Sequence, residues 1–122
     1  MLKFESDQRR EITAAARDES ERRIFALLRQ HYGPTHVWPG DAQALEVVRA
    51  ATFKAAGYEM NAERDVFKIA ALMLSFSDDF DAREPWAREI VAAREGNAPI
   101  ADLLYQAGIA EVRRHEDAAR RS

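Results

Sequence analysis

The stretch that decides the fold is Asn61-Ala62-Glu63-Arg64-Asp65-Val66-Phe67-Lys68-Ile69-Ala70-Ala71-Leu72-Met73-Leu74-Ser75-Phe76. Its apolar residues recur at helical spacing, and further apolar residues widen the stripe over most of the surface of such a helix. A helix that is apolar nearly all round is normally central in its domain. Asn61 supplies the expected N-cap, with Glu63 in the first turn. The segment therefore predicts a buried central helix.

Further helical segments flank this central one. Glycine is favoured just after a helix and proline in its first turn, which places boundaries at Gly57, Pro85 and Pro99. Asp41 is the expected cap of the helix that follows the first loop. The segments with helical periodicity are about residues 6–31, 41–56, 85–94 and 99–112. The predicted fold is all-α, a single irregular bundle of four to five helices with a long N-terminal helix.

Composition limits the class of protein. The chain has 122 residues, of which 47% are hydrophobic, and no cysteine. This length fits one domain, expected at residues 1–112, followed by a polar tail at residues 113–122 that should fray or be disordered. The missing cysteines exclude disulfides and thiolate metal sites. No apolar run approaches the roughly 18–20 residues of a membrane helix, so we expect a cytoplasmic protein without membrane contact.

Charge is unevenly distributed. The formal net charge is −3, which argues against a nucleic-acid-binding protein because such proteins are usually basic. Residues 57–84 carry seven acidic and three basic side chains, so the middle of the chain is its most acidic part. Such a run is most often a solvated face of the protein.

The sequence contains no recognisable catalytic or metal-binding motif. The three histidines form no His-Glu-x-x-His pair, and no phosphate-binding glycine loop or nucleophile elbow is present. Asp78, Asp79 and Asp81 fail the EF-hand pattern, because Arg83 stands at loop position 5 and Ile90 at position 12. These acids suit a turn and the cap of the next helix. We therefore expect a non-enzymatic protein with no cofactor and no metal.

Without a catalytic or metal-binding motif, protein binding is the remaining class of function. Tyr32 and Trp38 flank a short loop between helices, and aromatic residues of this kind are enriched at interface hot spots. For Trp38 the core and the surface are equally plausible positions. The candidate partner-binding residues are Tyr32, Trp38, Asp78, Asp79, Asp81 and Arg83.

Residues 57–90 also carry a family resemblance. The pattern is Gly57-Tyr58, Glu63-Arg64-Asp65-Val66, an apolar helix, Asp79-Phe80-Asp81 and Pro85-Trp86. This pattern resembles a group of small helical bacterial proteins encoded beside type VI secretion effectors and their adaptor chaperones. The resemblance implies a cytoplasmic co-chaperone that binds an adaptor chaperone, or the effector it carries, and helps to load or release the effector. It implies no catalytic residues.

Three alternatives remain open. Immunity proteins, which are often small and acidic, occur in the same gene neighbourhoods and neutralise a cognate toxin by binding it. A self-associating helical protein without an effector role is a second alternative, so a homo-oligomer is possible. A small enzyme or metal binder is the third.

Overall fold

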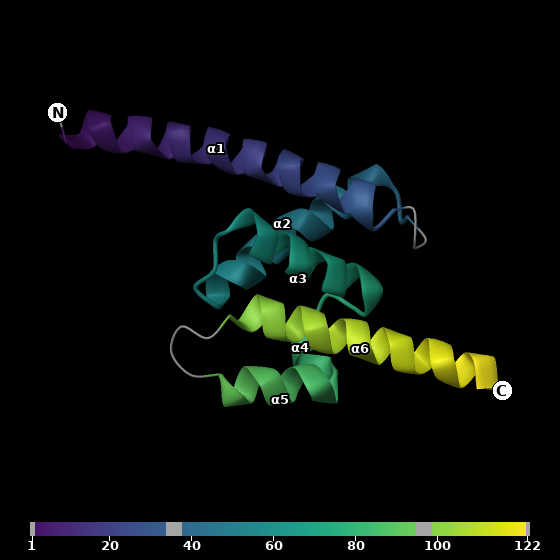
Figure 1. Cartoon of the computed structure of the whole chain (residues 1–122). Coiled ribbons are helices and arrows are strands. Elements are labelled where there is room, and N and C mark those ends of the chain that lie inside the picture. Colours follow the sequence, from purple (N-terminus) through teal and green to yellow (C-terminus); the bar gives the residue numbers. More distant parts are fainter. Residues whose placement is uncertain (1, 34–37, 95–98, 122) are drawn as a thin grey trace.

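The computed structural model describes residues 2–33, 38–94 and 99–121, with side chains from residue 16 onward. Within these ranges the chain forms six helices and no strand (Figure 1). The helices are α1 (Leu2–His31), α2 (Asp41–Gly57), α3 (Glu63–Ser75), α4 (Phe80–Arg83), α5 (Pro85–Ala93) and α6 (Ile100–Arg121). The prediction of an all-α bundle is confirmed.

Helix α3 is the centre of the bundle, as its apolar sequence predicts. It packs against α1, α2 and α6. Its buried residues are Val66, Ile69, Ala70, Ala71, Leu72 and Met73. The expected N-cap is wrong, because Ala62 occupies that position and no side chain caps the helix. Similarly, Gly40 precedes α2 as its N-cap, and Asp41 is the first residue of the helix itself.

Helix α1 contacts the bundle through its C-terminal turns. Ile24 and Leu28 lie one turn apart and are fully buried, and Tyr32 continues the same face just beyond the helix. Residues 16–19 are exposed, and the N-terminal part of α1 extends past the other helices in Figure 1.

The C-terminal half of the chain, with helices α4, α5 and α6, lies on the side of α3 that faces away from α1 (Figure 1). The one-turn helix α4, which the sequence pattern did not predict, buries Phe80 completely. The ring of Trp86, at the start of α5, packs against Phe76 and Phe80 with centroid distances of 5.1 and 6.2 Å. Trp86 is therefore largely a core residue, although its buried indole N–H has no hydrogen-bond partner.

Helix α6 continues through the segment expected to be a disordered tail. It ends at Arg121, and the side chains of residues 113–121 are exposed. The carboxylate of Glu111 forms an ion pair with the guanidinium of Arg114 at 2.7 Å. The same carboxylate lies 3.5 Å from the imidazole of His115. Such contacts three and four residues apart stabilise an exposed helix. That this segment frays or is disordered in isolation stays a prediction.

Candidate functional site

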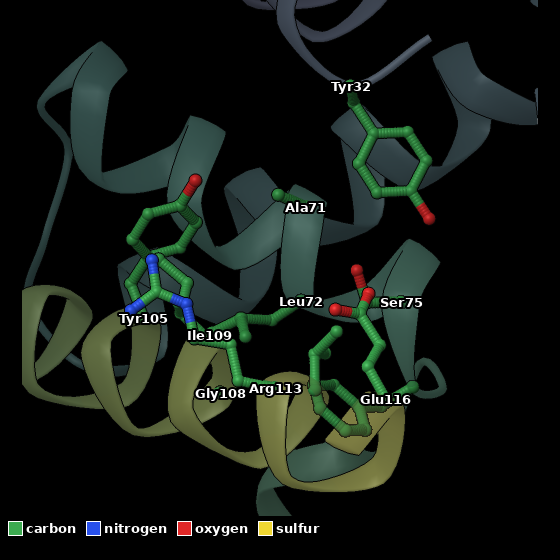
Figure 2. Close-up of a pocket in the computed structure, with 11 residues that line it drawn as sticks. Tyr32, Ala71, Leu72, Ser75, Tyr105, Gly108, Ile109, Arg113 and Glu116 are labelled. Carbon is green, nitrogen blue, oxygen red and sulfur yellow. The ribbon is translucent and has the colours of Figure 1, made fainter. Parts of the chain in front are cut away.

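An open groove runs between α3 and α6, with the end of α1 on its far side. Its volume is about 240 Å³. Figure 2 shows Tyr32 and Tyr105 on opposite sides of it, with Ala71 and Leu72 of α3 between them. The lining residues are Tyr32, Ala71, Leu72, Ser75, Phe76, Tyr105, Gly108, Ile109, Val112, Arg113 and Glu116.

The groove exists because α6 is much longer than α3. Helix α3 ends at Ser75 after 13 residues, whereas α6 has 22 residues and continues past it. Tyr105, Ile109 and Val112 recur at helical spacing on one flank of α6. No described helix covers this flank fully, so Ile109 stays 38% exposed. The chain therefore presents an apolar surface that its own helices leave open.

Small residues bring the two helices together. Gly108 of α6 lies so close to α3 that a Cβ there would collide with the side chain of Leu72. Ala71 and Ser75 line the α3 side of the groove with short side chains, which leaves room above them. This combination of close helix packing and small residues forms a depression where long side chains would have filled it.

Charged side chains border the apolar surface. Arg113 and Glu116 line the groove toward the end of α6. At the other end, the ammonium group of Lys68 lies 5.9 Å from the ring centroid of Tyr105 and pairs with Asp102. The hydrogen bond from Lys68 holds the pKa of Asp102 below its usual value. The groove thus has the anatomy of a protein-binding surface, with an apolar centre and a polar rim.

The two aromatic candidates lie in different environments. Tyr32 is only 8% exposed and belongs to the core, but its side chain also lines the groove. Trp38 is partly buried, with its indole N–H donating to Asp41 at 2.9 Å and its ring in an edge-to-face contact with Phe25. Trp38 is thereby fixed against α1 and α2. The structure does not bring the two aromatic residues together as one exposed loop surface.

The acidic candidates divide into an exposed and an internal group. Asp78 and Asp79 are exposed, with Asp79 accepting a hydrogen bond from Ser77 at 2.9 Å. The exposed Arg83 lies 4.0 Å from Asp79. Asp81 instead faces inward. That these residues contact a partner stays a prediction, and the inward position makes Asp81 the least accessible of them.

Asp81 forms a small polar network between α2 and α4. Its carboxylate accepts a hydrogen bond from the ammonium group of Lys54 at 2.7 Å and another from the hydroxyl of Tyr58 at 2.5 Å. Burial has the largest influence on the pKa of Asp81 and raises it, but the hydrogen bonds from Lys54 and Tyr58 outweigh burial and leave the pKa low. Burial also raises the pKa of Tyr58, and the bond to Asp81 raises it further. These groups hold α4 against the C-terminal end of α2.

Sequence reasoning missed most of the groove. The helical pattern of residues 99–112 contains Tyr105, Ile109 and Val112, but it assigns none of them, nor Ser75, a role in binding. The available signal was the position of Tyr105, Ile109 and Val112 on one face of α6, a helix that extends beyond the end of α3. Reading that signal requires knowing that α6 packs beside α3, and no local pattern supplies that pairing.

Other kinds of site are not apparent in the described part of the chain. No three histidine, aspartate or glutamate side chains among the described residues are grouped so that they could hold a metal ion. None of the described helices has both the length and the apolar character needed to cross a membrane. No protein-family model, curated protein or solved structure matches the chain significantly.

Proposed function

We propose that this protein is a non-enzymatic binding factor, a co-chaperone that assists an adaptor chaperone in loading or releasing a type VI secretion effector. The observation that carries the binding role is the open groove between α3 and α6, with Ile109 partly exposed in it. The type VI context comes from the resemblance of residues 57–90 alone. The proposed site of action is the cytoplasm, where an effector would be loaded.

The shape of the groove suits an amphipathic helix of the adaptor chaperone. The groove is lined by residues of α3 and α6 and by Tyr32 just beyond α1, so a partner helix seated in it would contact both α3 and α6. Helix-in-groove recognition uses apolar side chains spaced one turn apart, which would meet Tyr105, Ile109 and Val112. Tyr105 provides an aromatic surface of the kind that is enriched at binding hot spots.

A second candidate is an immunity protein that neutralises a cognate toxin. It is favoured by the carboxylates of Asp78 and Asp79, which are exposed on the side of the α3–α4 connection. Such a surface would complement a basic toxin active site and increase the association rate. Rescue of cells from the neighbouring toxin by co-expression would support this role. Continued killing despite confirmed binding would exclude it.

Co-purification with the neighbouring gene products tests the co-chaperone proposal. The informative variant is Ile109→Asp, which places a charge in the groove. Leu103→Asp is its matched control, because Leu103 is on the same helix, is 43% exposed and does not line the groove. We expect the tagged wild-type protein and the control to retain the adaptor chaperone, and Ile109→Asp to lose it. Retention of the effector alone, never the chaperone, would contradict the proposal.

A further inference from the structure

Helices α3 and α6 run in the same direction along the groove. Lys68 of α3 pairs with Asp102 of α6, and further along both helices the side chain of Leu72 meets Gly108. Figure 1 shows the two helices side by side in this sense. The groove therefore has a direction, and one of its ends is the point at which α3 stops.

The end of the groove at which α3 stops is negatively charged. Helix α3 ends at Ser75 and has no basic side chain in its last turn. The carbonyl groups of a last helical turn have no partners within the helix and carry a partial negative charge. Figure 2 shows the carboxylate of Glu116 on this side of the groove, as are the side chains of Ser75 and Tyr32. This end therefore attracts hydrogen-bond donors and positive charge.

Positively charged groups lie at the opposite end of the groove, around Tyr105. The ammonium group of Lys68 lies 5.9 Å from the ring centroid of Tyr105. The hydrogen bond from Lys68 lowers the pKa of Asp102 most, and the nearby charge of Arg64 lowers it further. Figure 2 shows the guanidinium of Arg113 turned back to the Tyr105 side. This end therefore attracts hydrogen-bond acceptors and negative charge.

An occupant of the groove has to satisfy its own backbone hydrogen bonds. Both walls are helices, and the described part of the chain forms no strand that could offer an open edge. An extended segment would bury unpaired N–H and C=O groups against Leu72 and Ile109, whereas a helix pairs these groups internally. Tyr105 and Glu116 mark the ends of the groove on α6, and their separation is about 16 Å along a helix, or about three turns.

We propose that the segment of the adaptor chaperone in the groove is a helix of about three turns that runs antiparallel to α3 and α6. This inference rests on the proposed function, because it takes the groove to be the chaperone-binding site. The unpaired N–H groups in the first turn of an antiparallel helix would face Glu116 and the carbonyl end of α3. The carbonyl groups of its last turn would face Lys68 and Arg113.

A helix in the opposite direction would reverse each of these contacts. Its last carbonyl groups would meet the carboxylate of Glu116 and the carbonyl end of α3, and its first N–H groups would meet the two cations. Like charges placed in this way disfavour the parallel arrangement. The distribution of charge along the groove thus selects the direction of the partner helix, while Tyr105, Ile109 and Val112 supply its apolar contacts.

Cross-linking with a photoreactive amino acid at each end of the groove tests the direction. The photoreactive amino acid replaces Ser75 in one full-length protein and Tyr105 in another, and each is co-expressed with the neighbouring adaptor chaperone. Mass spectrometry of the adducts locates the linked chaperone residues. We expect the residue linked to position 75 to precede the residue linked to position 105 by about seven positions, which is about 10 Å of helix.

The outcomes separate the direction from the function. The reverse order of linked chaperone residues would overturn the antiparallel direction and leave the co-chaperone proposal standing. The absence of chaperone adducts from both positions would overturn both. Adducts only between two copies of this chain would do the same, because they would make the groove an interface between copies.

Reversing the charge of Glu116 tests the electrostatic reason for the direction. Glu116→Lys removes an attraction and adds a repulsion, so it should raise the dissociation constant for the chaperone about fivefold or more. Asp117→Lys is the matched control, because Asp117 is also exposed but does not line the groove, and it should change the constant less than about twofold. Circular dichroism melts of both variants should match the wild type, because both residues are exposed. Equal affinity of Glu116→Lys and Asp117→Lys would overturn this reason.

Discussion

Gly108 of α6 lies against the side chain of Leu72 of α3, with no room between them for a Cβ. The rings of Phe76 and Trp86 lie just behind this contact, at 3.5 and 3.4 Å from the position a Cβ would take. This contact sets the distance between the two helices that form the groove. The position of the groove walls therefore depends on a residue without a side chain.

The first prediction concerns this contact. Gly108→Ala should lower the free energy of unfolding by up to about 2 kcal/mol, because overpacking costs about 1–3 kcal/mol and alanine recovers about 1 kcal/mol of helix propensity. Gly57→Ala is the matched control, since nothing lies within 4 Å of its Cβ position. Urea denaturation measures both variants. A Gly108→Ala variant as stable as Gly57→Ala would show that α6 is not held this closely.

The second prediction tests the central position of α3. Leu72→Ala should cost about 2–5 kcal/mol in free energy of unfolding, as expected for a buried leucine whose neighbours cannot collapse into the space. Leu103→Ala removes the same atoms from a side chain that is 43% exposed and should cost less than about 1 kcal/mol. Denaturant melts that give Leu72→Ala a loss below about 1 kcal/mol would contradict the placement of α3.

The third prediction concerns Asp81 and pH. Its low pKa in the folded state means that its stabilising effect is present above the unfolded pKa, near 3.9, and is lost as pH falls through the folded value. Asp81→Asn should lower the free energy of unfolding by about 1–3 kcal/mol at neutral pH. The difference from the wild type should shrink below about pH 4.

Asp79→Asn is the control for this pH effect, because Asp79 is exposed and its pair with Arg83 is long. It should change stability by no more than about 0.5 kcal/mol at any pH. Thermal or urea unfolding from about pH 7 to about pH 2 measures all three proteins. A difference between wild type and Asp81→Asn that stays constant to the lowest pH would refute the role given to Asp81.

The fourth prediction separates the groove from the acidic surface as the partner site. Binding through an apolar groove should change the dissociation constant by less than about threefold between about 0.1 and 0.5 M salt. Binding through Asp78 and Asp79 should weaken much more, because exposed charges are screened at these concentrations. Calorimetric titration of the adaptor chaperone at several salt concentrations distinguishes the two. A steep dependence of the dissociation constant on salt would place the interface at Asp78 and Asp79 and not at the groove.

Much of the fold could be predicted from the sequence, because its signals are local. The apolar stripe of residues 61–76 predicts the central helix, and Gly57 and Pro85 mark boundaries that the structure retains within one residue. Helix α4 was not predicted, because four residues are too few to show a period.

The candidate site could not be predicted in the same way. The two helices that form the walls of the groove, α3 and α6, each have an ordinary amphipathic pattern. The groove opens only where α6 extends beyond the end of α3. Tyr32 is a candidate partner-binding residue in the sequence because it adjoins a loop, yet it lies mostly in the core because it continues the face of Ile24 and Leu28. Which faces are left uncovered depends on how helices pair, and that information is not local in the chain.

The central claim is that the groove binds the adaptor chaperone, and site-specific photo-cross-linking tests it most directly. A photoreactive amino acid replaces Ile109 in one protein and Leu103 in another, each co-expressed with the neighbouring chaperone and effector. We predict a covalent adduct with the chaperone from position 109 and none from position 103. Adduct formation from position 103 but not 109, or with the effector alone, would contradict the claim.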